Sequence, residues 1–471
     1  MRLFNTLTNT LEVYAPQDGK TVGMYVCGPT VYDNVHIGNL RPILVFDTLR
    51  RYFEQYKGWE VIHVQNVTDV DDKLINRSIE TGKSVEEIAR NYTKAFFDLV
   101  DGLGVLEPTH SPRATEHVPE MIELIRELET AGFAYARDGD VYFRVEAVQD
   151  YGKLSGHRLE DQEAGARIEA SEKKENSLDF TLWKAAKPGE PKWASPWGEG
   201  RPGWHTECVV MSRKYLGDRR DIHAGGFDLA FPHHENEIAQ AEATMPPPFF
   251  RFWLHNGLLS FEGEKMSKSL GNFAYAKDVL EQFDAETVRY FYLSRHYRKP
   301  LAYSTAGLEA ARKAVQRVNN LLADIEATHR GKTDAGFGEQ GEAFVQSLEV
   351  FRAQYIEAMD DDLNTSGSLG AIHELVSAIG RFRQSAPTQD HGALRVAVDA
   401  VRELGKPLGL FQPRATGAVH GIEADLIALL IELRGALRAK KEFELTDRIR
   451  DRLGELGVVL KDTSDGTIWS R

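Results

Sequence analysis

Two short apolar runs near the start of the chain are separated by a longer stretch with helical spacing. Residues 21–27 form the first run, Gly28-Pro29 interrupts it, and apolar side chains then recur at helical spacing over residues 39–56. Residues 61–67 form the second run. Strands that alternate with helices in this way predict a parallel sheet with helices on its faces. The sequence therefore predicts an α/β fold that begins with a Rossmann-like doubly wound sheet.

The pattern changes over residues 113–203. A helix is expected over 116–131, followed by strands at 133–136 and 141–145 that are joined through Asp138-Gly139. Glycine and charged residues, with crowded tryptophan and proline, then continue to residue 204. The alternation of strand and helix returns over 205–257, so we interpret residues 113–203 as an insertion that splits the doubly wound domain.

After Tyr303 the sequence is helical almost throughout. Long amphipathic stretches cover 310–327 and 342–359, and a looser stretch at 413–421 is typical of a linker. Two helical segments and a strand at 457–460 end the chain. These patterns predict an α-helical bundle followed by a small α+β domain.

Length and composition exclude several classes of protein. The 471 residues suffice for three or four domains of about 100–200 residues each. A net charge of −14 argues against a protein that coats nucleic acid through bulk charge, but it leaves room for a local basic patch. No apolar run is long enough to span a membrane, and the first residues do not form a secretory signal. We expect a cytoplasmic protein with no membrane contact.

The loop over residues 27–39 is a candidate phosphate site. A glycine-containing turn leads into a helix N-terminus, where backbone N–H groups and the helix dipole attract anions. His36 could donate a hydrogen bond to a phosphate oxygen there, and Gly38 would let a flat group approach the backbone. A solvated histidine in a turn explains this motif about equally well.

A second motif, Lys265-Met266-Ser267-Lys268-Ser269, places two lysines beside small residues. Two mobile ammonium groups suit the charge that develops on a leaving pyrophosphate, although a basic loop alone is common. The pairing of the two motifs is much more specific. Together they resemble the signature motifs of class I aminoacyl-tRNA synthetases. The resemblance implies ATP as a substrate with Mg²⁺. It also implies catalytic and ATP-binding roles for His36, Asn39, Lys265 and Lys268, with Gly38 as a further ATP-binding residue.

The chain has only two cysteines, Cys27 and Cys208, which is too few for a secreted disulfide scaffold. Spacing alone favours two buried free thiols. His233 and Glu237 would lie on one face of a helix, a pattern that by itself is more typical of a surface pair. Cys27 ends a strand and Cys208 lies where the sheet resumes, so all four side chains could meet at one edge of the sheet. Two thiolates, an imidazole and a carboxylate can hold Zn²⁺.

The resemblance becomes specific for the cysteinyl-tRNA synthetases and extends nearly from end to end. It is carried by residues 24–33, 66–73, 196–208, 231–237 and 358–365. It implies one zinc ion per chain, with the ligands Cys27, Cys208, His233 and Glu237. It also implies that the cysteine pocket is lined by Thr68, Trp204 and Asp228, with His223 and His234 close by. The phosphate motif ends in Asn39 where the family has histidine, which leaves the role of Asn39 open although an amide can still donate there.

A metal explains how such a pocket would choose its substrate. Serine differs from cysteine by one atom, and a pocket that senses only shape separates near-isosteres poorly. Zinc binds a thiolate at about 2.3 Å and lowers the pKa of a thiol, whereas a serine hydroxyl is a much poorer ligand. The resemblance thus implies that L-cysteine is activated as an adenylate and transferred to tRNA(Cys).

The end of the chain is a candidate RNA contact. Basic residues outnumber acidic ones between Arg434 and Arg452, on a chain that is acidic overall. Trp469 at a mobile edge could stack on an unpaired base, with Arg448 and Arg471 as further contacts. Composition alone favours a solvated helix and a frayed tail, but the resemblance implies that this region reads the anticodon.

These observations predict a specific division of the chain. We expect a catalytic domain at 1–112 and 204–257, an insertion at 113–203, a connecting segment at 258–306, a tRNA-binding helical bundle at 307–412 and an anticodon-binding unit at 421–471. We also expect a monomer. Two alternatives are a ligase of mycothiol biosynthesis, which would activate cysteine in the same way, and an inactive paralogue that only binds RNA.

Overall fold

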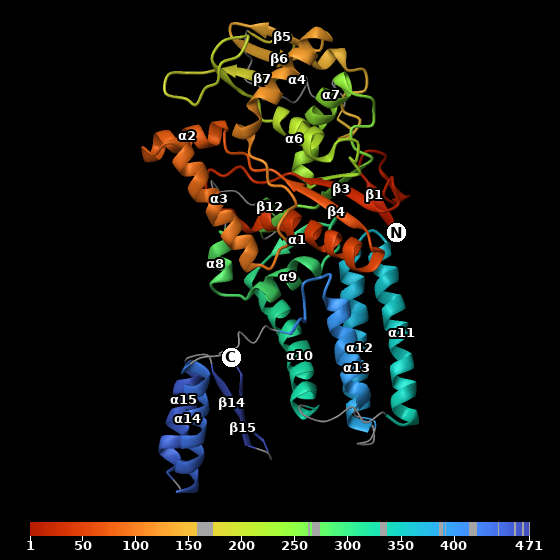
Figure 1. The fold of residues 1–471 in the computed structure, drawn as a ribbon, viewed down its shortest axis with the longest axis vertical. Coiled ribbons are helices and arrows are strands. Elements are labelled where there is room, and N and C mark those ends of the chain that lie inside the picture. The colour runs from red at the N-terminus through yellow and green to blue at the C-terminus, as the bar shows by residue number, and fades with distance from the viewer. Residues whose placement is uncertain are drawn as a thin grey trace. The chain divides into compact units, whose positions relative to one another are not determined.

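The computed structural model divides into two compact units, Met1–Phe411 and Gln412–Arg471 (Figure 1). The residues that it describes are 1–157, 173–261, 264–265, 274–329, 337–385, 390, 392–413, 422–440, 442–455, 458–463 and 466–470. Within these ranges, no helix is long and apolar enough to cross a membrane.

Four parallel strands form the central sheet of the first unit, in the order β10-β9-β3-β4. They are β3 (Thr21–Val26), β4 (Glu60–Gln65), β9 (Ile222–Gly226) and β10 (Phe252–Asn256). The parallel sheet and its two early strands confirm the predictions. β4 pairs with one edge of β3 and β9 with the other, so the strand order changes direction at β3. In such sheets ligands bind in the crevice at this point, beside the carboxyl ends of the strands.

Helix α1 (Ile37–Tyr52) connects β3 to β4, as expected. It begins slightly before the predicted start, because the Asn39 side chain accepts a hydrogen bond of 3.0 Å from the backbone N–H of His36 and closes the first turn. The helix continues as a π-helical turn, η1 (Phe53–Lys57), until Gly58 ends it in the left-handed region. Helices α2 (Asp72–Thr81) and α3 (Val85–Gly102) follow β4.

The described part of the predicted insertion contains the helix α4 and an antiparallel sheet in the strand order β5-β6-β7-β8. The turn between β5 and β6 runs through Asp138 and Gly139, which have φ of 51° and 82°, and it confirms the predicted hairpin. Its elements are η2 (Ala114–His117), α4 (Val118–Thr130), β5 (Ala134–Arg137), β6 (Asp140–Phe143), η3 (Val145–Ala147), β7 (Phe180–Ala185) and β8 (Gly200–Pro202).

The next segment returns to the parallel sheet. Helix α6 (Thr206–Leu216) precedes β9, and η4 (Phe227–Leu229), η5 (Ala230–His234) and α7 (Glu235–Thr244) connect β9 to β10. One apolar cluster contains Met121 and Leu124 of α4 together with Val209 and Met211 of α6. The inserted helix therefore shares a core with the helix that carries Cys208.

The remaining elements of the first unit surround this sheet. A short hairpin at the N-terminus consists of β1 (Arg2–Asn5) and β2 (Thr10–Val13). A small sheet in the order β12-β11-β13 is built from β11 (Leu259–Phe261), β12 (Glu264–Lys265) and β13 (Leu301–Tyr303), with α8 (Ala276–Leu280) and α9 (Ala285–Leu293) between β12 and β13.

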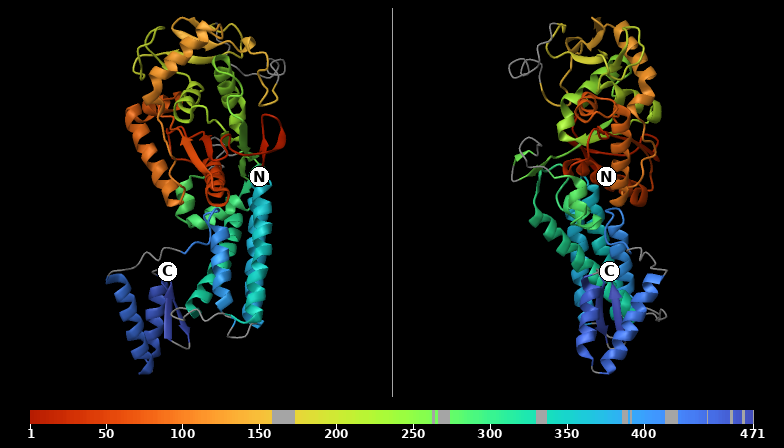
Figure 2. Two further views of the ribbon diagram at one scale, coloured as in Figure 1. Left: turned by 45° about the vertical axis from the view of Figure 1, so that its right-hand side comes forward. Right: turned by 90° about the vertical axis from the view of Figure 1, so that its left-hand side faces the viewer.

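Four long helices complete the first unit and lie side by side in Figure 2: α10 (Thr305–His329), α11 (Glu339–Asp360), α12 (Thr365–Ser385) and α13 (Gly392–Gly405). They confirm the helices that were predicted over 310–327 and 342–359. Leu348 and Tyr355 of α11 pack in one buried cluster with Ile372 of α12 and Val401 of α13.

The second unit contains α14 (Ile422–Ala439), α15 (Phe443–Glu455), β14 (Val459–Thr463) and β15 (Gly466–Ser470). Both helices and the first strand confirm the prediction, whereas the antiparallel pairing of β14 with β15 was not predicted. Ile427, Leu453 and Val458 form its small core. Most of the predicted linker, from residue 414 to residue 421, lies outside the described residues.

Candidate metal centre and active site

The four predicted zinc ligands come from four different elements. Cys27 directly follows β3, and its backbone N–H donates to Ala224 of β9 at 3.1 Å. Cys208 lies in the first turns of α6, His233 lies in η5 and Glu237 lies on α7. All four reach the same place, because parallel strands end at one edge of the sheet and the connections to α6 and α7 cross that edge.

The donor atoms of Cys27, Cys208, His233 and Glu237 lie within 4.8 Å of one another. The two sulfurs are 3.9 Å apart, Cys208 Sγ is 3.6 Å from His233 Nε2, and His233 Nε2 is 3.0 Å from Glu237 Oε1. Four such ligands arranged tetrahedrally about zinc would be separated by about 3.4–3.8 Å. The spacing and the chemistry of these donors fit a zinc ion with little rearrangement.

Burial gives this cluster an unusual electrostatic character. Cys208 and Glu237 are inaccessible to solvent, and both cysteines are free thiols. Burial raises the pKa of the Cys27 thiol to about 11 and raises the pKa of Cys208 well above its ordinary value. It also raises the pKa of Glu237 and lowers that of His233. Burial therefore favours the neutral imidazole, the form that ligates a metal, whereas the thiolates and the carboxylate are disfavoured until a cation such as a bound metal compensates their negative charge.

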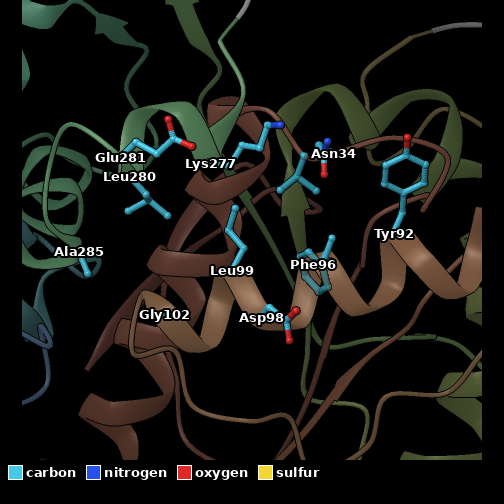
Figure 3. A pocket seen from close by; sticks show the side chains of 12 residues that line it. Asn34, Tyr92, Phe96, Asp98, Leu99, Gly102, Lys277, Leu280, Glu281 and Ala285 are labelled. Carbon is cyan, nitrogen blue, oxygen red and sulfur yellow. The ribbon is translucent and has the colours of Figure 1, made fainter.

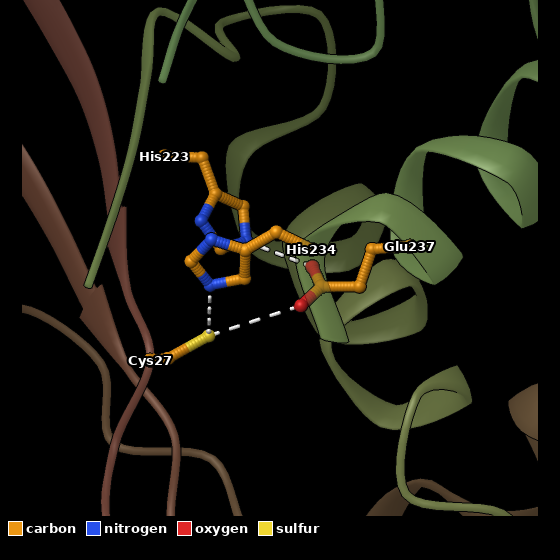
Figure 4. Close-up of side chains that lie close together, drawn as sticks. All are labelled: Cys27, His223, His234 and Glu237. Carbon is orange, nitrogen blue, oxygen red and sulfur yellow. Dashed lines mark hydrogen bonds and ion pairs between the residues drawn. The ribbon is translucent and has the colours of Figure 1, made fainter. Parts of the chain in front are cut away.

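A second donor set shares two members with the first. It consists of Cys27, His223, His234 and Glu237, which lie close together in Figure 4, with His234 and Glu237 on one helical segment. His234 Nε2 is 3.3 Å from Cys27 Sγ, and His223 Nε2 is 2.8 Å from Glu237 Oε2. The structure thus brings both of these histidines, which were expected near the cysteine pocket, into direct contact with predicted metal ligands.

Two further histidines orient the ring nitrogens that face the cluster. His205 Nδ1 lies 2.8 Å from His233 Nδ1, and His255 Nε2 lies 2.8 Å from His234 Nδ1. The Nε2 atoms of His233 and His234 are thereby left facing the cluster, and such outer partners fix the tautomer of a ligating histidine. His205 and His255 were not predicted. His205 lies within residues 196–208, which carry the family resemblance, whereas no sequence signal marks His255.

The predicted pocket residues differ in their surroundings. Trp204 stacks on His233 at a ring-centroid distance of 4.1 Å, which places the indole directly over a metal-ligand candidate. Thr68 is 1% exposed, and its hydroxyl donates to Glu207 at 2.8 Å. Asp228 is exposed in the turn that follows β9.

Glu207, which accepts the hydrogen bond from Thr68, was not predicted as a site residue. Burial raises its pKa well above the ordinary value, although the Thr68 hydrogen bond acts in the opposite direction.

The predicted phosphate loop leads directly into α1. His36 precedes the helix, and the first helical turn contains no acidic residue that would neutralise the positive end of its dipole. Gly38 leaves room for the His36 ring, because a Cβ atom there would lie 2.8 Å from two ring atoms. Asn39 accepts from the His36 backbone through its carbonyl oxygen. Its amide N–H groups remain the part of the side chain that can donate.

The structure describes little of the side chains that were predicted to contact the triphosphate of ATP and the tRNA. Lys265 lies in β12, where it pairs with Ser260, and Lys268 lies outside the described residues. Trp469 lies in β15 opposite Leu460, and Arg471 lies outside the described residues. Arg448 is exposed on α15.

A separate hollow of about 520 Å³ lies between α3 and α8 (Figure 3). Tyr92, Phe96 and Leu99 line it from α3, and Lys277 and Leu280 line it from α8. Asn34 and Val35 of the predicted phosphate loop also line it, whereas His36, Gly38, Asn39 and the residues predicted for the metal and cysteine sites do not.

Comparisons with known proteins show the family of the chain. The family described as tRNA synthetases class I (C) catalytic domain matches residues 13–313, and the DALR domain matches residues 354–412. A cysteine–tRNA ligase of Clostridioides difficile is 47% identical over 471 residues, with both chains covered completely. A cysteine–tRNA ligase of Caldicellulosiruptor saccharolyticus is 49% identical over 467 residues, which is 99% of each chain.

Solved structures show that the fold extends beyond these relatives. Mycobacterium tuberculosis methionyl-tRNA synthetase in complex with methionyl-adenylate has a TM-score of 0.64 at 17% identity, covering 85% of this chain and 93% of its own. A putative arginyl tRNA synthetase from Campylobacter jejuni has a TM-score of 0.57 at 12% identity, covering 84% of this chain and 93% of its own. The fold is thus that of the class I tRNA synthetases. The chain belongs to this family, in the branch formed by the cysteine–tRNA ligases.

Proposed function

We propose that the chain activates L-cysteine with ATP and transfers it to the 3′ end of tRNA(Cys). One observation carries the choice of amino acid: two thiols, an imidazole and a carboxylate converge within 4.8 Å at the carboxyl edge of a class I sheet. Thiolate ligands suit zinc, and a substrate thiol is the side chain that such a metal distinguishes best from a hydroxyl. Full-length relatives that are named cysteine–tRNA ligase support the same function.

The proposed zinc ligands are Cys27, Cys208, His233 and Glu237. Bound zinc would supply a Lewis acid that favours the ionised thiol of cysteine over the hydroxyl of serine. Trp204, Thr68 and Asp228 would line the remainder of the amino-acid pocket, and His223 and His234 would hold Glu237 and Cys27 in place. No separate editing site is needed if ligand chemistry provides the selectivity.

The first reaction step needs no protein nucleophile. An oxygen of the cysteine carboxylate forms a bond to the α-phosphorus of ATP, and the bond from that phosphorus to the bridging oxygen breaks, so that pyrophosphate leaves with the electron pair. We assign His36, Lys265 and Lys268 to the stabilisation of charge on the phosphates, with Mg²⁺ accompanying ATP. Gly38 and Asn39 would shape the ATP site at the start of α1. A hydroxyl of the terminal tRNA ribose then attacks the acyl carbon, and AMP leaves.

The domain division is part of the proposal. Residues 1–112 and 204–257 would form the catalytic domain, 113–203 the insertion and 258–306 the connecting segment. The bundle at 307–412, of which residues 354–412 match the DALR domain, would bind tRNA. The unit at 421–471 would read the anticodon, with Trp469, Arg448 and Arg471 as RNA contacts. We further propose that the protein acts as a cytoplasmic monomer.

Three measurements test the function against its rivals. ATP–pyrophosphate exchange should depend on cysteine and not on serine, and the purified chain should contain about one zinc per molecule. Transfer of cysteine should occur to tRNA and not to an amino-sugar acceptor, which would instead indicate the mycothiol-type ligase. Absence of any cysteine-dependent exchange in the zinc-loaded protein would favour the inactive RNA-binding paralogue and refute the proposal.

A further inference from the structure

A buried carboxylate lies beside the donor cluster, and the reaction described above does not use it. Glu207 is 2% exposed in the first turn of α6, directly before Cys208. Its Oε2 accepts a hydrogen bond of 2.8 Å from the Thr68 hydroxyl and another of 3.4 Å from the Asn66 side-chain amide. Glu207 belongs to neither of the two candidate metal-ligand sets.

These contacts connect three segments at the carboxyl edge of the sheet. The Asn66 side chain accepts from the Gly28 backbone N–H at 2.8 Å, and the Thr68 backbone N–H donates to Pro29 at 3.2 Å. A side chain at Gly28 would not fit, because its Cβ atom would lie 1.6 Å from the Asn66 carbonyl oxygen. The Thr68 hydroxyl is therefore fixed by its backbone from one side and by Glu207 from the other.

The hydrogen-bond directions determine what Thr68 can still bind. A threonine hydroxyl has one proton and two lone pairs. Glu207 Oε2 receives the Asn66 amide, so it acts as an acceptor, and the Thr68 proton is directed at that same oxygen. The Asn66 amide is also 3.4 Å from Thr68 Oγ1 and occupies one lone pair weakly. The remaining lone pair can accept a hydrogen bond but cannot donate one.

An amino acid offers two charged groups to such an atom. Its α-carboxylate only accepts hydrogen bonds, whereas its α-ammonium only donates them. We propose that Glu207 is a positioning residue that holds the Thr68 hydroxyl proton, so that Thr68 Oγ1 accepts a hydrogen bond from the α-ammonium of the bound cysteine. The inference rests on the proposed function, because it takes cysteine as the amino acid in this pocket.

Two substitutions of Glu207 distinguish its effect on the orientation of the Thr68 hydroxyl from the effect of its own negative charge. Glu207→Met keeps an unbranched side chain of similar length but removes the acceptor, and Glu207→Gln keeps one acceptor oxygen. Glu235→Gln is the matched control. Glu235 is another buried glutamate, on α7, and it accepts from the backbone N–H groups of Gly152 and Ser155 at 3.0 and 2.9 Å without contacting Thr68.

The probes are L-cysteine and 3-mercaptopropionate, which keeps the thiol and the carboxylate but lacks the ammonium. Their Kd values are measured by calorimetry on the zinc-loaded full chain, together with zinc content and Tm. Glu207→Met should weaken cysteine about 10–100-fold, the range expected when a hydrogen bond to a charged group is lost, and should change 3-mercaptopropionate less than about 3-fold. Glu207→Gln should bind cysteine with an affinity close to that of wild type. Glu235→Gln should change the Kd values of cysteine and 3-mercaptopropionate by the same factor.

The opposite pattern overturns the inference. If Glu207→Met retains zinc and weakens both probes equally, or if Glu207→Gln is as defective as Glu207→Met, the residue does not act by orienting Thr68. Should Glu207→Met not fold, Glu207→Asp provides the same comparison, because it withdraws the carboxylate from Thr68 by one methylene. The proposed function has a separate test in the wild-type chain, since cysteine-dependent pyrophosphate exchange there does not depend on the role of Glu207.

Discussion

Replacement of Cys208 by serine tests which buried donors hold the proposed zinc ion. The two candidate sets share Cys27 and Glu237, so only the residues that belong to one set alone can distinguish them. Cys208 belongs to the first set and His234 to the second. Cys208→Ser changes a single atom and replaces a soft thiolate by a much poorer ligand in a fully buried position.

The size of the effect follows from the geometry. Cys208 Sγ lies 3.9 Å from Cys27 Sγ and 3.6 Å from His233 Nε2, so Cys208 can act as a ligand almost without movement. Substitution of a partner that only orients a ligand lowers metal affinity about 10–100-fold. Loss of a ligand should therefore lower zinc affinity more than about 100-fold, which corresponds to more than about 2.7 kcal/mol.

Competition with a chromophoric chelator measures this affinity in the folded protein. Ser212→Ala is the matched control, because Ser212 is buried on the same helix and its hydroxyl donates only to Val209 of that helix, at 3.0 Å. The control should keep about one zinc per chain, and His234→Ala should lose only about 10–100-fold in affinity, the effect of a residue that orients a ligand without binding the metal. If Cys208→Ser binds zinc as tightly as wild type while His234→Ala loses it, the second donor set holds the ion and the proposed ligands are wrong.

Three further perturbations test other parts of the proposal. Lys268→Ala should lower the rate of adenylate formation by a factor of hundreds, or about 3–4 kcal/mol, with cysteine affinity nearly unchanged. Rapid-quench kinetics measure both quantities, and loss of affinity at an unchanged rate would contradict the assigned role. Deletion of residues 421–471 should leave cysteine-dependent pyrophosphate exchange near wild type while aminoacylation of tRNA falls sharply, whereas a parallel loss of both activities would mean that the unit only supports the catalytic body. Asp47→Asn should lower the free energy of unfolding by about 3–5 kcal/mol, because the buried Asp47 carboxylate is bonded to the buried Arg289. Burial opposes ionisation of Asp47, but Arg289 and Arg51 outweigh it and hold its pKa below the ordinary value. Since the folded pKa is the lower one, this stabilisation is present above the unfolded pKa of about 4 and is lost as pH falls through the folded pKa. The difference between wild type and variant in denaturant titrations should therefore shrink in acid, and a difference that is constant with pH would refute the argument.

The sequence predicted the elements whose signals are local. Alternation and apolar spacing indicated β3, β4 and α1, and Asp138-Gly139 indicated the hairpin of the insertion. β15 was missed because its pairing with β14 depends on contacts across a turn in a short, mostly polar segment. Boundaries shifted where a side-chain contact decides them, as at His36, where Asn39 closes the first turn of α1.

The candidate metal centre could not be predicted from local sequence patterns alone. Cys27 and Cys208 are 181 residues apart in the sequence, and they meet because α6, which carries Cys208, packs against β3 and precedes β9, the strand that pairs with β3. Periodicity predicts strands but does not specify their order in a sheet. Because ligands bind beside the carboxyl ends of parallel strands, the sequence allowed the four predicted ligands to meet at that edge of the sheet. The family resemblance identified which residues these ligands are.

Sequence analysis found the residues whose chemistry is distinctive and missed those whose role is defined by their contacts. A glutamate in the first turn of a helix, as Glu207 is in α6, ordinarily faces solvent and stabilises the helix dipole, so its position alone indicates nothing further. Burial changes that interpretation, because a buried carboxylate must find hydrogen-bond donors, and the donors here are Thr68 and Asn66. The same reasoning applies to His205, which sets the ring nitrogen that His233 presents to the cluster. On our proposal, the recognition of cysteine would depend partly on residues that act only through their neighbours, and such residues become visible only when burial and hydrogen-bond direction are known.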